Sequence, residues 1–249
     1  MIDSFDVERY ARILENRTRD APIYSAAYIM PSPPFGHARK HVNHLELVKR
    51  MIADKTWTRM LDSGGLEGAF KVLRGYPSLG DFLAFQFTID FNYGPAMSFE
   101  ESEFVVAGPG ARDGIRKCFI DTAGLSEADV IRFMAETAED HFKRLGLAFD
   151  TLWGRPLQPI DCQNVFCEVD KYARVVHPEA TGKSGRSRIK QRFIPTAQPV
   201  PQWYPPKWNL RMEAEGAVPQ RQRVASLERQ REFSFFSESP GAVKRIVPA

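Results

Sequence analysis

Residues 161–174 read Asp-Cys-Gln-Asn-Val-Phe-Cys-Glu-Val-Asp-Lys-Tyr-Ala-Arg, and their pattern decides the expected fold class. Polar side chains recur at helical spacing on one stripe, made up of Asp161, Asn164, Glu168 and Lys171. Apolar side chains share the opposite stripe, made up of Cys162, Val165, Phe166, Val169 and Ala173. Two such stripes are typical of an amphipathic helix that packs against a core. The pattern predicts a helix that Asp161 caps and that runs to about residue 175.

The same spacing recurs along most of the preceding chain. It predicts helices over residues 5–19, 39–62 (one or two helices), 65–74, 79–91, 111–119 and 126–145, with a short continuation over 146–153. We expect Ser78 and Ser126 to cap two of these helices, and the Pro- and Gly-rich residues 29–36 to form a loop. Alternating strand patterns are almost absent, so the predicted fold class is mainly α.

The pattern changes near Pro178. Residues 178–220 contain seven prolines and show little periodicity. Such composition is typical of an extended arm rather than of a packed helix. We therefore expect a helical domain over residues 1–178, and a Pro-rich basic arm and tail over residues 179–249 that pack on the same domain.

The overall composition is that of an ordinary globular protein, with 43% hydrophobic and 26% charged residues among 249. No apolar stretch approaches the roughly 18 residues of a membrane span, and the first residues lack the apolar core of a secretory signal. The three cysteines, Cys118, Cys162 and Cys167, contain no CxxC pair of the metal-binding type. We expect no disulfide framework, no cofactor and a cytoplasmic location.

Positive charge is concentrated in the last third of the chain. Residues 171–249 hold 15 Lys and Arg against 6 Asp and Glu, whereas residues 1–170 hold 19 against 25. The densest part, residues 183–192, has five bases and no acid: Lys183, Arg186, Arg188, Lys190 and Arg192. Such a segment suits a polyanion such as nucleic acid, although a solvated loop has the same composition.

Residues 104–119 place a Gly-Pro-Gly turn between an apolar run and a new helix. The glycines at 108 and 110 permit close approach, and backbone N–H groups at a helix start can bind a phosphate. This is the layout of the hairpin in a helix-hairpin-helix motif, which binds the DNA backbone without reading sequence. An ordinary corner between two helices has the same pattern. Gly108, Gly110 and Arg112 are the candidate backbone contacts here.

The polar stripe of residues 161–174 also has chemical potential. A carboxylate at a helix N-terminus, such as Asp161, is held ionised by the helix dipole and can act as a general base or stabilise a cation. The structural alternative is that Asp161 only caps the helix and that Glu168 and Lys171 form a surface ion pair.

Four stretches together carry a resemblance to a known family: residues 82–93, 104–119, 160–174 and 204–208. They resemble the helical enzymes of phage thymine hypermodification, which are the α-glutamyl/putrescinyl-thymine pyrophosphorylases or amino acid:DNA transferases. They also resemble the helical domain of 5-hydroxymethyluracil DNA kinases. This group is itself similar to helix-hairpin-helix DNA glycosylases. The resemblance covers roughly residues 40–210.

The resemblance implies a glycosylase-like helical fold in which Asp161 is the counterpart of a catalytic aspartate. The lysine nucleophile of bifunctional glycosylases has no counterpart, because Gly114 occupies its position, although Lys117 is near. An extra helix over residues 126–145 also departs from the glycosylase pattern. The chain has no Gly-x-x-x-x-Gly-Lys-[Ser/Thr] loop, so we expect it to act at the step after the kinase.

That step implies a substrate of double-stranded DNA carrying a pyrophosphorylated 5-hydroxymethyluracil. The base would be flipped out, and an amino acid or polyamine would replace the pyrophosphate. The proton of the incoming amine would go to Asp161 or, as second choice, Glu168. The pyrophosphate would be held by Lys171, Arg174 and the bases of residues 183–192.

The remaining candidates would recognise the base. Amide side chains that can read its edge are Gln86, Gln163 and Asn164. Aromatic rings that can stack on it are Tyr93, Tyr172 and Trp203. Asp90 and Asn92 are polar within an apolar run and are expected to face the pocket.

Two alternatives remain open. One is a DNA N-glycosylase for a modified base, in which Asp161 stabilises the sugar cation; the other is a helical DNA-binding module without catalysis. We expect no metal site. Although His37, His41 and His44 cluster, no acidic or thiol partner is near them in the sequence. Cys162 and Cys167 are expected to be packing residues.

Overall fold

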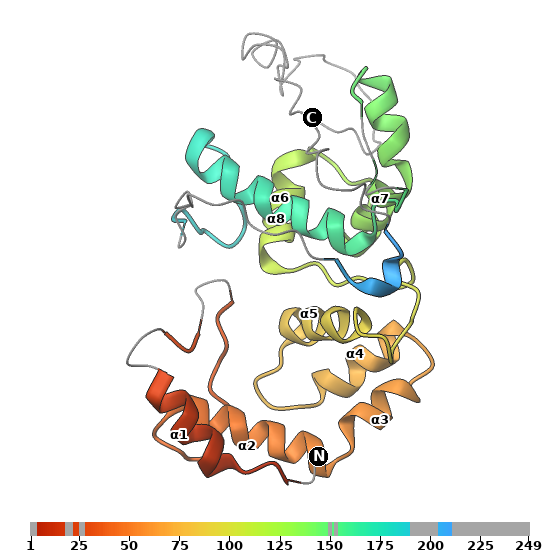
Figure 1. Cartoon of the computed structure of the whole chain (residues 1–249). Coiled ribbons are helices and arrows are strands. Elements are labelled where there is room, and N and C mark those ends of the chain that lie inside the picture. The colour runs from red at the N-terminus through yellow and green to blue at the C-terminus, as the bar shows by residue number, and fades with distance from the viewer. Residues whose placement is uncertain are drawn as a thin grey trace, which may run out of the picture. The chain divides into compact units, whose positions relative to one another are not determined.

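The computed structural model describes residues 4–17, 22–24, 28–148, 151, 154–189 and 204–210 of the chain. Within these residues the regular structure consists of eight α-helices, α1–α8, and one 3-10 turn, η2, with no strand (Figure 1). The prediction of a mainly α fold is confirmed. None of the helices within these residues combines the length and the apolar character that a bilayer crossing requires.

Contacts between Cα atoms divide the chain into two compact units. The first comprises residues Met1–Gly108 with Ser187–Gln202, and the second comprises Pro109–Arg186 with Trp203–Ala249. The boundary falls inside the Gly-Pro-Gly turn. The sequence pattern did not indicate this subdivision within residues 1–178.

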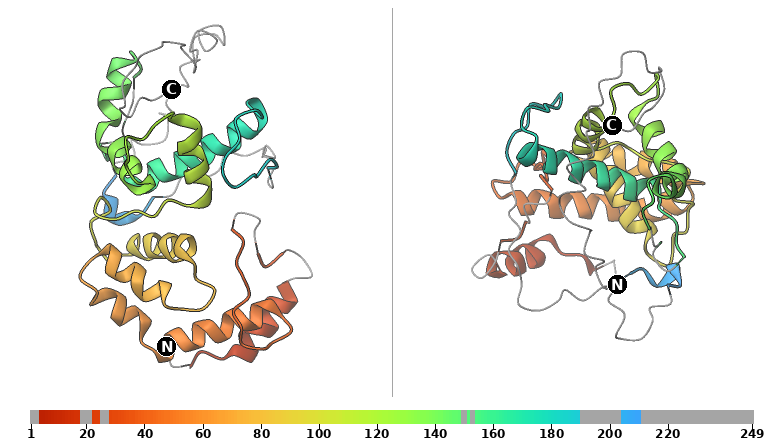
Figure 2. Two further views of the ribbon diagram at one scale, coloured as in Figure 1. Left: turned by 180° about the vertical axis from the view of Figure 1, so that it is seen from behind. Right: turned by 90° about the horizontal axis from the view of Figure 1, so that it is seen from above.

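The first unit contains five helices: α1 (Val7–Arg17), α2 (Lys40–Ala53), α3 (Thr56–Leu61), α4 (Leu66–Arg74) and α5 (Asp81–Asn92). Each packs against the next along the chain, as Figure 2 shows for α1 beside α2. Apolar side chains from α2 to α5 and from the segment after α5 form one core, which includes Leu47, Met60, Ala69, Leu73, Leu83, Ala84 and Met97. Burying a large apolar side chain contributes about 1.5–3 kcal/mol, so this core stabilises the unit.

Helix α5 begins differently from the sequence prediction. Its N-cap is Gly80, not Ser78. Ser78 has a left-handed φ of 64°, and its hydroxyl donates a hydrogen bond to the carbonyl oxygen of Ser32 at 3.2 Å. The prediction of a Ser78 cap is wrong because this serine shapes the preceding turn and binds another loop.

The second unit contains α6 (Pro109–Cys118), α7 (Glu127–Arg144), α8 (Pro159–Val176) and η2 (Pro206–Trp208). Ser126 caps α7 as predicted, and Asp129 completes a capping box with it. The expected continuation of the helix over 146–153 is wrong for the described residues, which are not helical. Gly146 takes a φ of 64° and ends the helix in the manner of a C-terminal glycine.

Helix α8 begins three residues before the predicted position. Gln158 is its N-cap and Pro159 its first residue, so Asp161 occupies the third helical position rather than the cap. The Asp161 carboxylate still serves the helix start, because it accepts a hydrogen bond from the Gln158 N–H at 2.8 Å. This is the acidic half of a capping box.

Two glycines let α6 approach α8 closely. A Cβ atom at Gly114 would lie 2.0 Å from the carbonyl oxygen of Phe166, and one at Gly110 would lie 3.0 Å from the Cys167 sulfur. Residues 110 and 114 are one helical turn apart, so they form one smooth strip on α6. Gly114 therefore has a packing role.

The buried side of α8 is rotated from the predicted one. Cys162, Phe166 and Ala173 are buried as expected, but Val165 is 55% exposed. Gln163 and Asp170 are buried instead. The prediction that Val165 is a core residue is therefore wrong. Contact with the glycines of α6 decides which side of α8 faces inward.

Candidate functional site

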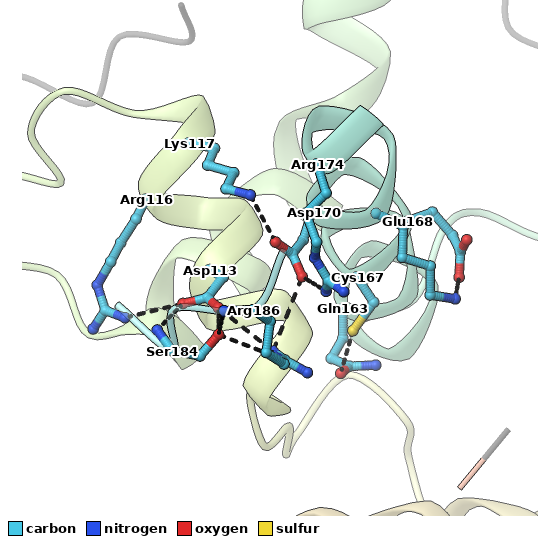
Figure 3. A network of polar contacts seen from close by, with 11 residues as sticks. Asp113, Arg116, Lys117, Gln163, Cys167, Glu168, Asp170, Arg174, Ser184 and Arg186 are labelled. Carbon is cyan, nitrogen blue, oxygen red and sulfur yellow. Dashed lines mark hydrogen bonds and ion pairs between the residues drawn. The ribbon is translucent and has the colours of Figure 1, made fainter. Parts of the chain in front are cut away.

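The second unit contains a buried cluster of charges between α6 and α8, centred on Asp170 (Figure 3). The Asp170 side chain is 1% exposed. Lys117 Nζ of α6 lies 2.9 Å from its Oδ1, and the Arg174 guanidinium, one turn further along α8, binds its Oδ2. Both cationic side chains are themselves buried. We call these three residues the Asp170 cluster.

The two cations keep Asp170 ionised. Burial alone raises the pKa of a carboxyl group, because it removes water from the charged form. The hydrogen bonds and charges of Arg174 and Lys117 outweigh burial and leave the pKa of Asp170 below its ordinary value. Asp170 is therefore ionised near neutral pH and orients two cations.

A second buried carboxylate, Asp113 of α6, holds a loop of residues 182–186, the Ser184 loop. The Ser184 backbone N–H donates to Asp113 at 3.3 Å, and the Ser184 hydroxyl donates to the same carboxylate. A Cβ atom at Gly182 would lie 2.4 Å from the Asp113 carboxyl carbon, so the loop passes directly over this group. Burial raises the pKa of Asp113, but these hydrogen bonds and the Arg186 charge leave it lowered.

Arg186 joins the two carboxylates. Its Nη2 lies 3.5 Å from Asp113 and 3.9 Å from Asp170, and its Nε donates to the Ser184 hydroxyl at 2.9 Å (Figure 3). The Arg186 side chain remains 39% exposed. Two buried acids thus face three cations, Lys117, Arg174 and Arg186, and the surplus positive charge lies at the solvent-exposed end.

The sequence pattern indicates this arrangement only in part. It draws attention to Lys117 as a neighbour of Gly114, but it does not single out Asp113, Asp170 or Ser184. A signal was present, because Asp170 lies seven residues after Gln163 and so on the same side of α8. An acid on a buried helical side needs a cation, and Arg174 stands four residues further on.

Asp161 lies at the start of α8, with its side chain partly exposed. Arg155 Nη1 donates to its carboxylate at 3.1 Å, and the Arg155 guanidinium stacks over the Trp208 ring at 4.0 Å. These contacts tie residues 204–210 to the helix start. The sequence identified Asp161 but not Arg155, its partner in the structure.

The other polar residues of the α8 stripe lie at the surface. Glu168 is 67% exposed and pairs with Lys171 three residues away, and Asn164 and Tyr172 are exposed as well. The expected polar stripe is therefore a solvated side of the helix, with Glu168 and Lys171 as its surface ion pair. Gln163 is wholly buried, donates to Asn164 at 2.7 Å and accepts from the Cys167 thiol at 3.5 Å.

Four candidates belong to the first unit. The Asn92 amide is fully buried and bonds both backbone groups of Phe99, which closes the turn after α5. Gln86 is 8% exposed, and its Oε1 accepts a hydrogen bond from the Tyr28 hydroxyl at 3.3 Å. Its buried Nε2 has no hydrogen-bond partner in the described part of the chain. Asp90 is exposed and Tyr93 is half-buried.

The candidates of the basic arm are only partly described. Lys183, Arg188 and, on α6, Arg112 are exposed. Lys190, Arg192 and Trp203 lie outside the described residues. Gly108 is buried at the end of the first unit and Gly110 packs on α8.

The structure offers no cluster of three metal-binding side chains within the described residues. It does correct one expectation, since His41 has an acidic neighbour, Glu15, at 3.3 Å. Burial raises the pKa of the Cys118 and Cys162 thiols to about 11, so both stay protonated near neutral pH and are unsuited to act as nucleophiles.

Comparison with known proteins gives one match. The family model described as "5-hmdU DNA kinase, helical domain" matches residues 1–182. No curated protein and no solved structure matches the chain. The matched range covers α1 to α8 and ends at Gly182, the first residue of the Ser184 loop. The chain therefore belongs to the family of the 5-hmdU DNA kinase helical domain.

Proposed function

We propose that this protein modifies 5-hydroxymethyluracil-derived bases in double-stranded DNA by replacing a pyrophosphate with an amine. Membership in a family named for a DNA kinase of this base supports an enzyme of DNA modification and carries the proposal. Two cations of the second unit that reach solvent, Lys183 and Arg186, suit both the DNA backbone and a leaving pyrophosphate.

In the proposed reaction a C–N bond forms at the exocyclic carbon of the base, while the bond from that carbon to the pyrophosphate oxygen breaks. The attacking amine must first lose a proton. Asp161 is the preferred acceptor because it is partly exposed at the start of α8, whereas Glu168 is a solvated surface acid. Arg174 is less suited to hold pyrophosphate than expected, because Asp170 already binds it.

Within the first unit, Gln86 is the amide best suited to bind a uracil-type base. A uracil-type base presents an N–H donor next to a carbonyl acceptor. The Gln86 carboxamide offers the complementary pair, and its Nε2 donor is unused within the described residues. A buried amide donor without a partner costs free energy, which a bound base would recover. The Tyr28 hydroxyl occupies the Oε1 acceptor of the free protein.

The test is mass spectrometry of nucleosides from duplex DNA that contains pyrophosphorylated 5-hydroxymethyluracil, incubated with the protein and a mixture of amino acids and polyamines. We expect a new amine adduct and released pyrophosphate. Asp161→Asn should lower turnover by about 10²-fold or more, as removal of a general base does. Asp129→Asn is the control, because it removes the equivalent acid of the α7 capping box. Full turnover by Asp161→Asn would exclude Asp161 as the base.

A DNA-binding module without catalysis is the second candidate. The observation that favours it is the ion pair between Asp161 and Arg155. A carboxylate that is paired at a helix start can serve to stabilise the fold without taking part in catalysis. The same assay separates the candidates. Unchanged nucleosides would indicate the module, and abasic sites would indicate a glycosylase.

A further inference from the structure

The Ser184 loop shows an arrangement that a simple solvated basic loop would lack. Its serine hydroxyl donates to a buried acid, Asp113, and accepts from the Nε and the backbone N–H of Arg186. Ser184 thus connects the arginine to α6 through three hydrogen bonds. Gly182 permits this, since a side chain there would collide with Asp113.

The contacts leave one edge of Arg186 available. They use Nε and Nη2, and within the described residues none uses Nη1. The neighbouring Lys183 is exposed and makes no hydrogen bond or ion pair within these residues. A fixed guanidinium edge and an exposed ammonium group three residues earlier in the chain suit a phosphodiester, because the arginine supplies oriented donors and the lysine a mobile charge.

The charges of the site point to an anion. Asp113 and Asp170 are both ionised and both lie on the inner side of Arg186, while the side chain is 39% exposed on the outer side. Arg116 of α6 lies 3.8 Å from Asp113 but adds no surplus charge, because it also pairs with Glu127 at 3.1 Å. The buried acids therefore fix the cations in place but do not cancel them.

We propose that Asp113 and Ser184 are positioning residues, which hold Arg186 and Lys183 in the geometry that binds a phosphate of the DNA backbone. This proposal depends on the proposed function in one respect, which is that DNA is the binding partner. Asp113 itself does not touch the DNA; it acts through Ser184 and Arg186. The alternative is that the same contacts only stabilise the fold.

The experiment measures binding of a fluorescent 20-base-pair duplex by the full chain between 50 and 300 mM salt. Each phosphate contact adds about 0.9 to the slope of log K against log salt. We expect Arg186→Ala and Lys183→Ala each to reduce the slope by about one contact. Ser184→Ala keeps every charge, yet it should reduce the slope as Arg186→Ala does and weaken binding roughly fivefold at 100 mM salt.

Ser126→Ala is the matched control, because its hydroxyl also donates to an aspartate, Asp129, elsewhere in the second unit. Its slope should equal that of the wild type. Ser184→Thr, which keeps the hydroxyl, should restore the wild-type slope. Asp113→Asn should behave as Ser184→Ala does, provided that its far-ultraviolet circular dichroism shows a folded chain.

A folded Ser184→Ala variant with the wild-type affinity and slope would overturn the proposal and leave the contacts a purely structural role. A wild-type chain that shows no salt-dependent binding would also overturn the proposal. It would contradict the assumption that DNA is the partner as well. The binding slopes are measured independently of turnover, so a chain that binds as expected but forms no adduct would contradict only the proposed function.

Discussion

Asp170 shows how a single residue organises the interior of the second unit. A lone charge at 1% exposure would cost several kcal/mol, but Lys117 and Arg174 compensate it. The arrangement is asymmetric, because removing the acid leaves two buried cations without its compensating charge. Asp170 is therefore far more important to folding than its two neighbours on the surface, Glu168 and Lys171.

Asp170→Ala should lower the free energy of unfolding by about 3–5 kcal/mol, the usual cost of breaking a buried ion pair from one side. Glu168→Ala is the control on the same helix. Its ion pair is exposed, so the change should stay within about 0.5 kcal/mol. Urea unfolding followed by circular dichroism measures both. If Asp170→Ala lowered the free energy of unfolding by less than about 1 kcal/mol, Asp170 would not be needed to compensate the charges of Lys117 and Arg174.

The two buried acids also make stability depend on pH. The pKa of Asp113 is lowered in the folded chain, so its contribution is present above the unfolded value, near 3.8, and is lost as the pH falls through the folded value. The stability difference between wild type and Asp113→Asn should therefore be constant from pH 7 to about pH 5 and shrink below about pH 4. Urea midpoints at pH 7, 5, 4 and 3 test this. A difference that does not change with pH would contradict it.

Single residues were the least predictable part of the site. Asp161 stands out from its position at a helix start, and Gln86 from its place in an apolar run. Asp113 and Ser184 do not, because they are 71 residues apart and nothing local to either indicates the other. Long-range hydrogen bonds of this kind leave no periodic signal.

At the scale of elements, the contact of α6 with α8 depends on absent side chains. The strip of Gly110 and Gly114 brings the two backbones together and so places Lys117 next to Asp170 of α8. The helices themselves could be predicted within a few residues from their spacing. The rotation of α8 could not, because hydrophobicity favours Val165 as a core residue while close packing selects Gln163 and Asp170.

Gly114→Ala should lower stability by about 2 kcal/mol or more, because its methyl group would lie 2.0 Å from the Phe166 carbonyl and α6 would have to move. Gly75→Ala is the control. Gly75 has an ordinary helical φ of −70°, and the nearest atom to an added Cβ is 3.5 Å away, so little change is expected. Thermal unfolding compares the two. Equal melting temperatures would mean that α6 and α8 tolerate a wider spacing.

At the scale of the whole molecule, the chain has two compact units, and the boundary lies at Gly108 and Pro109. The sequence marks this point as a turn but offers no reason to separate the helices before it from the helices after it. Helical spacing continues on both sides, and only the long-range contacts show that two sets of helices form. Domain boundaries without a long polar linker are hard to predict for this reason.

If the units have separate cores, damage to one should stay within it. We expect Asp170→Ala to raise hydrogen exchange in α6 and α8 by about tenfold or more and to leave α4 and α5 unchanged, because the first core contains none of the Asp170 cluster. Hydrogen exchange followed by mass spectrometry measures this by peptide. Equal loss of protection in all four helices would indicate a single cooperative unit.

Gly182 also bears on how the family diverges. Since any side chain at this position would meet the Asp113 carboxylate, the two positions are constrained as a pair. A relative with a larger residue at 182 would need a smaller one at 113, and then the serine at 184 would lose its acceptor. Correlated substitution across these three positions would therefore distinguish lineages that retain a fixed basic loop from those that have abandoned it.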